Sequence, residues 1–426
     1  MARHAQPQTA ADLGLMPEGR TTSDRLVTLA NWQDPPFNRW SFQHLRELVP
    51  TARVARGSGP VTRLAPETRD LDGLRFAAAD GTPTTLAALL TATYTDAFLV
   101  VHRRRLVVEK YFNGMTPATP HLLQSVSKSI TGTLAGIMIA RGELDPAELV
   151  TSYVPELAGT SWEGARLRDV LDMRTGTRFS EDYADLKAEV RQYEQVAGWR
   201  PQTDPQTADD LYSYIAGLEN KGPHAGPFDY RSILTDLLGW IIECAGRARF
   251  ADLLSRDLWA RIGAQHDAEV TVDGHGHPVT DGGISVTARD LARFGQCYVA
   301  RGRSSGRRVI PASWIDDSWR GDDETRAAFA DAPQAERFPG GLYRNQWWAP
   351  FPSQAVLLGS GIYGQTLYID LAAEAVVVKF STWPEALDLT LADQHVRACR
   401  AVVAALNGQD RPRGATGPAG RTHQTS

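Results

Sequence analysis

The residues best suited to chemistry are a serine placed three positions before a lysine, in the stretch Ser125-Val126-Ser127-Lys128. The apolar, small-residue run that follows predicts a helix beginning near Ser125. Residues three apart share one helix face, so the Lys128 amine can reach the Ser125 hydroxyl. A neutral lysine can then accept the serine proton, which requires the lysine pKa to fall below its ordinary value of about 10.4. The alternative interpretation is an ordinary helix start, because such a tetrad also arises by chance.

Two other stretches offer the remaining parts of an acyl-transfer site. Tyr230 follows a proline and a polar turn just before a predicted helix, where it can relay a proton to a leaving group. The glycines of Leu358-Gly359-Ser360-Gly361-Ile362 let a strand edge approach a ligand closely. The N–H groups of Ile362 and Ser125 can then form an oxyanion hole. The alternatives are a packing tyrosine and a plain turn between strands.

The elements that must position these residues follow from hydrophobic periodicity. Runs at 97–101 and 106–111 predict a β-hairpin, and the C-terminal third predicts strands at 346–349, 355–358, 365–371 and 375–381, followed by a helix at 389–406. Helical spacing fills the middle of the chain, at 167–173, 208–218, 232–245 and 250–262. Thr287 is the predicted N-cap of another helix, which includes Ala288 to Leu291. Gly142 is predicted to end the helix that begins near Ser125.

This order predicts an α+β fold with one mainly antiparallel sheet built from both ends of the chain, flanked by helices, with an inserted all-helical domain. The expected organisation is a loose N-terminal tail at 1–24, a discontinuous sheet domain at 25–150 and 275–407, a helical domain at 151–274, and a disordered tail at 408–426. An aromatic, Pro-rich stretch at 32–40 is expected to form an ordered arm, followed by a short helix within 42–48.

Composition narrows the function classes. A net charge of −5 and 42% hydrophobic residues describe an ordinary globular chain with no nucleic-acid footprint. The three cysteines, far apart in apolar runs, predict buried free thiols in a reducing compartment. Residues 1–19 lack the apolar core of a secretory signal, and no apolar run is long enough to span a bilayer. We therefore expect a cytoplasmic protein with a small-molecule amide or ester substrate, no nucleic-acid or membrane partner, and no cofactor. A homodimer is one alternative for its assembly.

Four stretches taken together resemble the serine β-lactamase and penicillin-recognising superfamily, in its class C-like branch. They are the Ser125–Lys128 tetrad, Gly142–Pro146 with Tyr153–Leu157, Tyr230–Ser232 before Leu237–Glu243, and Gly282–Ser285 with Ala288–Gly295. The resemblance covers roughly residues 85–405. It implies a β-lactamase-like fold, with Ser125 as nucleophile, Lys128 as its base, Tyr230 as proton relay and Ile362 as the second oxyanion donor.

Within this branch the chain resembles the hydrolases of 6-aminohexanoate oligomers, on stretches that include Glu181-Asp182-Tyr183 and Gln346-Trp347-Trp348. That likeness implies that Tyr183 contacts the leaving amide nitrogen, that Glu194 holds a free substrate amine, and that Trp348 lines the pocket. The predicted substrate-binding set is Tyr183, Glu194, Ser232, Asp281, Trp348 and Tyr363.

Some residues depart from the family pattern. The Lys-Thr-Gly motif of β-lactamases is replaced by Gly359-Ser360-Gly361, which argues against efficient β-lactam hydrolysis. Tyr363 stands where histidine is expected, and resembles esterases of the branch. The alternatives to a linear-amide hydrolase are therefore a carboxylesterase or D-amino-acid peptidase on the same machinery, and a catalytically idle ligand-binding module. His275 and His277 are interpreted as a surface loop, because their spacing offers no third metal ligand.

Overall fold

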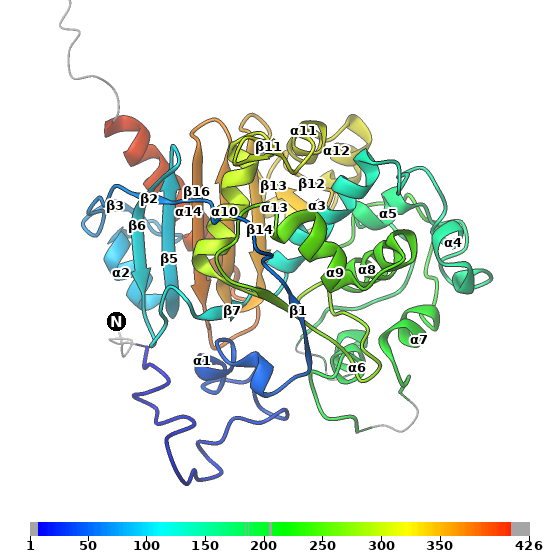
Figure 1. Cartoon of the computed structure of the whole chain (residues 1–426), viewed down its shortest axis with the longest axis horizontal. Helices are drawn as coiled ribbons and strands as arrows, with labels where there is room; N and C mark the ends of the chain where they lie inside the picture. The colour runs from blue at the N-terminus through cyan, green and yellow to red at the C-terminus, as the bar shows by residue number, and fades with distance from the viewer. Residues whose placement is uncertain (1–6, 184, 186, 204–206, 410–426) are drawn as a thin grey trace, which may run out of the picture.

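The protein is described by a computed structural model that covers residues 7–183, 185, 187–203 and 207–409. Its largest feature is an eight-stranded sheet in the order β12-β13-β14-β15-β16-β5-β6-β2 (Figure 1). The strands are β12 (Leu342–Arg344), β13 (Trp347–Ala349), β14 (Val356–Gly361), β15 (Gln365–Asp370), β16 (Ala375–Ser381), β5 (Thr95–His102), β6 (Arg105–Tyr111) and β2 (Ala65–Pro66). All neighbours pair antiparallel except β2 with β6. The predicted α+β class, with one sheet built from both ends of the chain, is confirmed.

Helices cover both faces of this sheet, which explains why its central strands are buried along their length. The helix α10 (Ala288–Val299) packs on β16 and β5, and α3 (Val126–Ala140) packs on β14. The helix α14 (Leu389–Gln409) contacts β15, and α2 (Leu86–Ala92) contacts β5. Every residue of β5 and β16 is buried as a result.

Helix α3, which carries the predicted nucleophile at its start, is almost entirely buried. Its small residues allow this, because a Cβ on Gly132 would lie only 2.6 Å from the Asn345 carbonyl oxygen. The helix ends as predicted, with Gly142 in the left-handed region at φ 72° just beyond its C-cap. Thr287 also caps α10 as predicted, by accepting the Asp290 N–H.

A second, four-stranded antiparallel sheet was not predicted. Its order is β1 (Thr51–Val54), β8 (Ala268–Thr271), β9 (Ile284–Thr287) and β7 (Pro120–Leu122). The strand β8 lies within the segment predicted to be all-helical, so that prediction is wrong at this end. The strand has four residues and pairs on one side with β1, more than 200 positions earlier, as in Thr51 opposite Thr271, and on the other side with β9. These pairings make the segment a strand.

The middle of the chain is otherwise mainly helical (Figure 1). Its helices are α4 (Val150–Tyr153), α5 (Leu167–Leu171), α6 (Glu189–Val196), α7 (Leu211–Ala216), α8 (Ile233–Gly246) and α9 (Phe250–Leu254), with a 3₁₀ turn at Pro155–Leu157 and a π-helical turn at Ser255–Trp259. The long helix α8 packs against α3 and α5. The remaining elements are β3 (Arg75–Ala77), β4 (Pro83–Thr85), β10 (Arg303–Ser304), β11 (Arg307–Arg308), α11 (Ala312–Arg320), α12 (Asp323–Ala330) and α13 (Gln334–Arg337).

The N-terminal arm joins the helical part to the sheet part. The Trp32 indole N–H donates to the Trp199 carbonyl oxygen at 2.6 Å, and the Asn38 amide donates to the Trp383 carbonyl oxygen at 2.7 Å. The short helix of this region is α1 (Asn38–Ser41), followed by a 3₁₀ turn at Leu45–Glu47 rather than a helix across 42–48. Within the tail predicted to be loose, Leu15 is buried, which corrects that prediction locally. Most of the predicted C-terminal disordered tail, from 410 onward, lies outside the described residues.

Candidate active site

The predicted nucleophile and base lie within hydrogen-bond distance. Ser125 is the N-cap of α3, and the Lys128 Nζ lies 2.9 Å from the Ser125 Oγ. The small sheet positions this helix start, because β7 ends at Leu122 and the Leu123 N–H donates to Ile284 of β9 at 2.9 Å. Gln124, directly before the serine, has a left-handed φ of 47°. A non-glycine residue in that region costs about 1–3 kcal/mol and must be held by its surroundings, as is common at functional sites.

The surroundings of Lys128 differ from those predicted. Its side chain is 1% exposed, and its Nζ donates to the Asp281 carbonyl oxygen at 3.1 Å and lies 3.5 Å from the Asp281 carboxylate. Burial disfavours the ammonium, but the acidic groups around it, Asp281 among them, outweigh this and hold the Lys128 pKa above its ordinary value. The expectation of a lowered pKa is therefore wrong, because acidic groups rather than basic ones surround the lysine.

Behind this ion pair lies a network of buried acidic groups. The Tyr193 hydroxyl donates to the Asp281 Oδ1 at 2.6 Å, and the Asp281 N–H donates to the Asp236 Oδ1 at 3.0 Å. Burial and the neighbouring Asp281 raise the Asp236 pKa well above its ordinary value. The network thus fixes the Asp281 carboxylate against Lys128.

Tyr230 is the third member of the catalytic cluster, with Ser125 and Lys128. It lies two residues before Ser232, the N-cap of α8, and its ring lies 5.2 Å from the Lys128 Nζ. The ring stacks on Trp348 at 5.4 Å between centroids. Burial raises the Tyr230 pKa, and the positive charge of Lys128 only partly opposes this, so the phenol keeps its proton in the resting site. Ser125, Lys128 and Tyr230 therefore form one compact group, as predicted.

The glycine-rich strand end packs directly against the serine. A Cβ on Gly361 would lie 2.7 Å from the Leu123 carbonyl oxygen and 3.0 Å from the Ser125 backbone nitrogen, so only glycine fits there. Gly361 ends β14, and Ile362 opens a 3₁₀ turn in which Tyr363 takes a left-handed φ of 59°. The Ser125 N–H donates to no other described residue. The residue before Ile362 thus lies directly against the Ser125 backbone, so the two predicted oxyanion donors come from segments in contact.

A cavity of about 330 Å³ opens at this cluster. Five predicted residues line it: Ser125, Tyr183, Tyr230, Trp348 and Ile362. Most of the rest of the wall is apolar, as is usual for sites that take small organic ligands.

The other predicted substrate-binding residues do not line that cavity in the described part of the chain. Glu194 is 3% exposed and lies between Arg191 at 2.9 Å and Arg200 at 2.8 Å. Tyr363 is buried edge-on against Phe42 at 5.2 Å. Through these contacts the side chains of both residues are held by other protein groups.

Ser232 and Asp281 contact residues of the site without lining the cavity. The Ser232 N–H donates to the Glu181 carboxyl group, and Asp281 faces Lys128 as described above. Both residues are buried. Ser232 thus holds Glu181 in place and Asp281 holds Lys128, and neither is among the residues that line the cavity.

Glu181 is the acidic residue on the cavity wall, and sequence reasoning did not single it out as a site residue. It lies among Ser125, Tyr183 and Tyr230 in the cavity lining. Burial raises its pKa, and the charge of Lys128 only partly offsets this. The available signal was its place in Glu181-Asp182-Tyr183, one of the stretches that carry the family resemblance.

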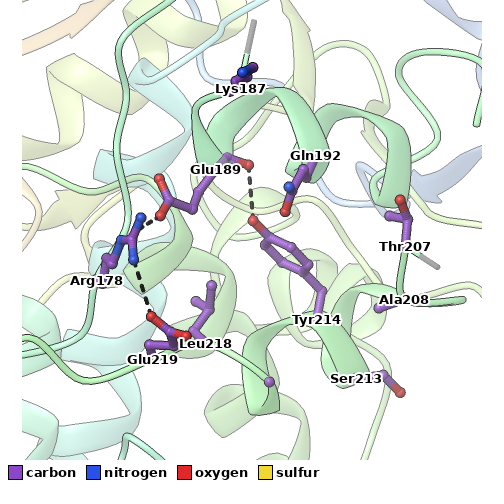
Figure 2. Close-up of a pocket in the computed structure, with 11 residues that line it drawn as sticks. Arg178, Lys187, Glu189, Gln192, Thr207, Ala208, Ser213, Tyr214, Leu218 and Glu219 are labelled. Atoms are coloured by element: carbon purple, nitrogen blue, oxygen red, sulfur yellow. Dashed lines mark hydrogen bonds and ion pairs between the residues drawn. The ribbon is translucent and has the colours of Figure 1, made fainter. Parts of the chain in front are cut away.

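Two further features lie apart from this site. A cavity of about 420 Å³ between α6 and α7 contains Arg178, whose guanidinium pairs with Glu189 at 2.8 Å and Glu219 at 3.1 Å (Figure 2). The guanidinium is thus engaged by two carboxylates, and the described cavity wall carries no pair of nucleophile and base.

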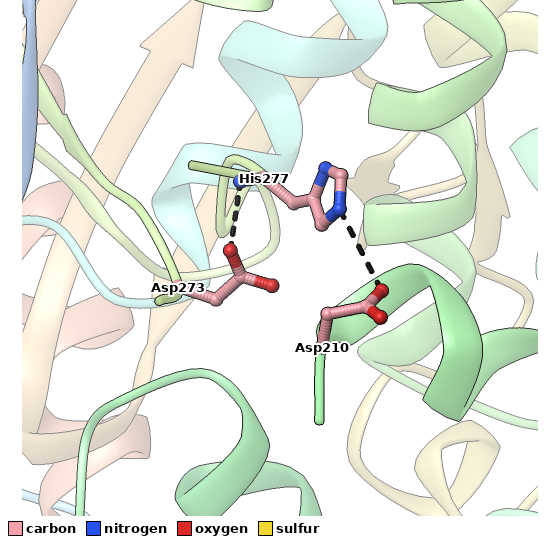
Figure 3. A group of neighbouring side chains, drawn as sticks. All are labelled: Asp210, Asp273 and His277. Atoms are coloured by element: carbon pink, nitrogen blue, oxygen red, sulfur yellow. Dashed lines mark hydrogen bonds and ion pairs between the residues drawn. The ribbon is translucent and has the colours of Figure 1, made fainter. Parts of the chain in front are cut away.

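Asp210, Asp273 and His277 also come together near the start of α7 (Figure 3). The Asp273 Oδ1 accepts the N–H groups of His275 and His277, and its Oδ2 accepts the Leu211 N–H. This carboxylate therefore fixes the loop against α7.

In the described residues, no helix is both long and apolar enough to cross a membrane.

Comparisons with known proteins agree with this geometry. A family model described as Beta-lactamase matches residues 92–400. The 6-aminohexanoate-dimer hydrolase of Paenarthrobacter ureafaciens is 41% identical over 358 residues, which cover 84% of this chain and 88% of that protein.

Solved structures show the same fold. A Bacillus anthracis protein provisionally assigned as a 6-aminohexanoate-dimer hydrolase superposes with a TM-score of 0.83 and 28% identity, over 92% of this chain and all of that one. A class C beta lactamase from Rhodobacter sphaeroides gives a TM-score of 0.55 at 17% identity, over 75% of this chain and 97% of that one. The chain therefore belongs to the beta-lactamase family and is a serine hydrolase.

Proposed function

We propose that the protein hydrolyses short linear amides, of the 6-aminohexanoate-oligomer kind, through an acyl-enzyme on Ser125. The observation that carries this proposal is the 2.9 Å contact between the Lys128 Nζ and the Ser125 Oγ at the wall of an apolar cavity. The substrate class is supported by the relative named 6-aminohexanoate-dimer hydrolase, which is 41% identical over most of both chains.

The reaction proceeds in two halves. The Ser125 oxygen attacks the substrate carbonyl carbon while its proton passes to the Lys128–Tyr230 pair. The carbon–nitrogen bond then breaks, and the leaving amine takes a proton from Tyr230. Water next attacks the acyl-enzyme, its proton returns to the pair, and the acid product leaves with the Ser125 hydroxyl restored.

The Lys128–Tyr230 pair must lose one proton before it can act as a base. Lys128 holds its proton because of Asp281 and the other acidic groups around it, and burial keeps Tyr230 protonated. Two such close groups titrate as a pair, so the active form has one proton fewer than the resting form. Activity is therefore expected to rise with pH until the pair has lost that proton.

Backbone N–H groups stabilise the negative charge that develops on the carbonyl oxygen. Ser125 and Ile362 supply them, and the close approach of Gly361 to the Ser125 nitrogen, where a Cβ would lie at 3.0 Å, supports this assignment. Removal of one such donor costs about 10²–10³ in kcat in well-studied hydrolases.

The cavity wall next to the serine supplies the contacts for the leaving group. Tyr183 and Glu181 both line it, and burial raises the pKa of the Glu181 carboxyl above its ordinary value. We assign them to the amide nitrogen side of the substrate, where Tyr183 is also placed by the family resemblance.

An ester substrate is the second candidate, and one observation favours it. Glu194, expected to hold a substrate amine, is engaged by Arg191 and Arg200 and has no surface on the cavity. A substrate without a free amine, such as a carboxylic ester, needs no such contact. The same machinery then acts with an alcohol as the leaving group.

The test combines a substrate panel with identification of the acylated residue. Wild-type protein is incubated with linear 6-aminohexanoate dimer and with short p-nitrophenyl esters, and the trapped acyl group is located by mass spectrometry. The acyl mass is expected on Ser125, and Ser125→Ala should lose hydrolysis of every substrate cleaved. Ser129→Ala is the control from the same helix, because the Ser129 hydroxyl donates to the Gln346 carbonyl oxygen at 3.0 Å. Full activity in Ser125→Ala would overturn the proposal.

A further inference from the structure

The cavity that opens at Ser125 is also lined by residues outside the catalytic cluster. One group of them, here called the far wall, comes from α13, from the start of α14, and from the loop before α14. Apolar side chains dominate this wall: Pro333, Phe338, Ala386, Leu387, Leu389 and Val396. Leu387 and Leu389 are 60% and 56% exposed, which is unusual for leucine and leaves apolar surface available to a ligand. The shape and chemistry of this part suit an unbranched aliphatic chain.

One cationic side chain lies in that far wall. Arg337, the last residue of α13, lines the cavity, and its side chain is 18% exposed. Its Nε donates to the Asp393 Oδ1 at 2.6 Å, and its guanidinium carbon lies 4.7 Å from the centre of the Phe338 ring. Within the described residues, neither of its two terminal amino groups donates a hydrogen bond to another side chain or carbonyl. A guanidinium has five N–H donors, so Arg337 keeps an unused edge.

The cavity lining carries few charged side chains. Arg337 is the cationic group among its described lining residues, and Glu181 is the acidic one. His395, also in the far wall, adds no positive charge, because burial holds its pKa well below the ordinary value. A ligand with a negative end is therefore attracted toward Arg337.

We propose that Arg337 binds a terminal carboxylate, at the end of an aliphatic chain whose amide or ester carbonyl lies at Ser125. The free guanidinium edge matches the two oxygens of a carboxylate, and the apolar wall between the two points contacts the chain. This inference rests on the proposed function, since it requires a carbonyl group bound at Ser125. It assigns the substrate class as linear amides or esters that end in a free carboxylate, and it makes Arg337 a specificity-determining residue.

The test compares two substrates that differ in one charge. One is a linear amide of 6-aminohexanoate with its free carboxylate, and the other is the same compound with the carboxylate converted to the methylamide. Wild-type protein is expected to prefer the acid, and Arg337→Gln should reduce the ratio of kcat/KM for acid over methylamide by about 10- to 100-fold, as for loss of a charged hydrogen bond. The change should appear in KM rather than kcat, because the contact is remote from the reacting atoms. Arg301→Gln, which breaks an exposed ion pair with Asp316 at 2.5 Å, is the matched control and should leave the ratio unchanged.

Two results would overturn the inference. One is a wild-type protein that does not distinguish the acid from its methylamide, and the other is an Arg337→Gln variant that loses both substrates equally, as expected if Arg337 only holds α14 through Asp393. Labelling of Ser125 by a fluorophosphonate distinguishes both of these results from a failure of the proposed function. A labelled serine with no charge preference rejects the carboxylate subsite alone, whereas an unlabelled serine rejects the proposed reaction itself.

Discussion

Replacement of Asp281 by asparagine is expected to make the protein more active at neutral pH. The Asp281 carboxylate lies 3.5 Å from the Lys128 Nζ, and both groups are buried. Coulomb's law at an effective dielectric constant of about 20 gives this pair an interaction of at most about 5 kcal/mol. That attraction stabilises the protonated lysine, which is the inactive form of the base.

The substitution keeps the geometry and removes the charge. The asparagine Oδ1 can still accept the Tyr193 hydroxyl, which now bonds to the Asp281 Oδ1 at 2.6 Å. Its amide NH₂ then faces Lys128, where it repels an ammonium and donates to a neutral amine. The pKa of Lys128 therefore falls, and the rise of kcat/KM with pH moves to lower pH by at least about one unit.

The assay is kcat/KM for a short p-nitrophenyl ester between pH 6 and about 10.5, the range that spans the ordinary lysine pKa. Asp316→Asn serves as the control, since its carboxylate pairs with Arg301 at the surface. Thermal unfolding of each variant shows whether a loss of activity reflects a loss of folded protein. A pH profile for Asp281→Asn that coincides with that of the wild type would refute the role given to this ion pair.

Three further predictions concern the site and its support. Gly361→Ala should lower kcat by about 10²-fold or more, measured on the same ester, because the new methyl group would displace the oxyanion donors; an unchanged kcat would exclude the assigned hole. Glu181→Gln should slow amide cleavage, while Asp182→Asn, its exposed neighbour, should not; equal rates in both variants would remove Glu181 from the site. Asp257→Asn should lower the free energy of unfolding at pH 7 by about 1–2 kcal/mol, measured with urea, because the carboxylate accepts hydrogen bonds from Arg141. Although burial opposes it, that pairing holds the Asp257 pKa below its ordinary value, so the contribution is present above about pH 4 and is lost progressively as the pH falls further; a difference as large at pH 2 as at pH 7 would contradict this.

Local patterns in the sequence were sufficient for the central pair. Ser125 and Lys128 lie within one helical turn, so the tetrad alone predicts their contact, which the structure shows at 2.9 Å. The β5–β6 hairpin, the end of α3 at Gly142 and the capped start of α10 at Thr287 were predictable for the same reason, because each depends on residues close together in the chain. Tyr230 was a candidate from its position after a polar turn and before a predicted helix, and the family resemblance supported its role.

The state of the base was decided by tertiary structure. Lys128 meets the carbonyl oxygen of a residue 153 positions later, and the Asp281 carboxylate beside it reverses the expected direction of its pKa. Charges act through space, so no local pattern around Lys128 contains this information. The small sheet behind the nucleophile escaped prediction for a related reason, since β1 and β8 are short and become strands only by pairing.

The tertiary structure also decided which acidic and basic side chains reach the cavity. Glu181 and Glu194 are equally acidic in the sequence, yet Glu181 lines the cavity and Glu194 is enclosed by Arg191 and Arg200. Arg337 carries no motif at all, and its place in the wall follows from the packing of α13 against the start of α14. The sequence by itself therefore determined the reactive group and the family. Packing of distant segments determined the charge of the base and the walls proposed to select the substrate, because both depend on residues that only the fold brings together.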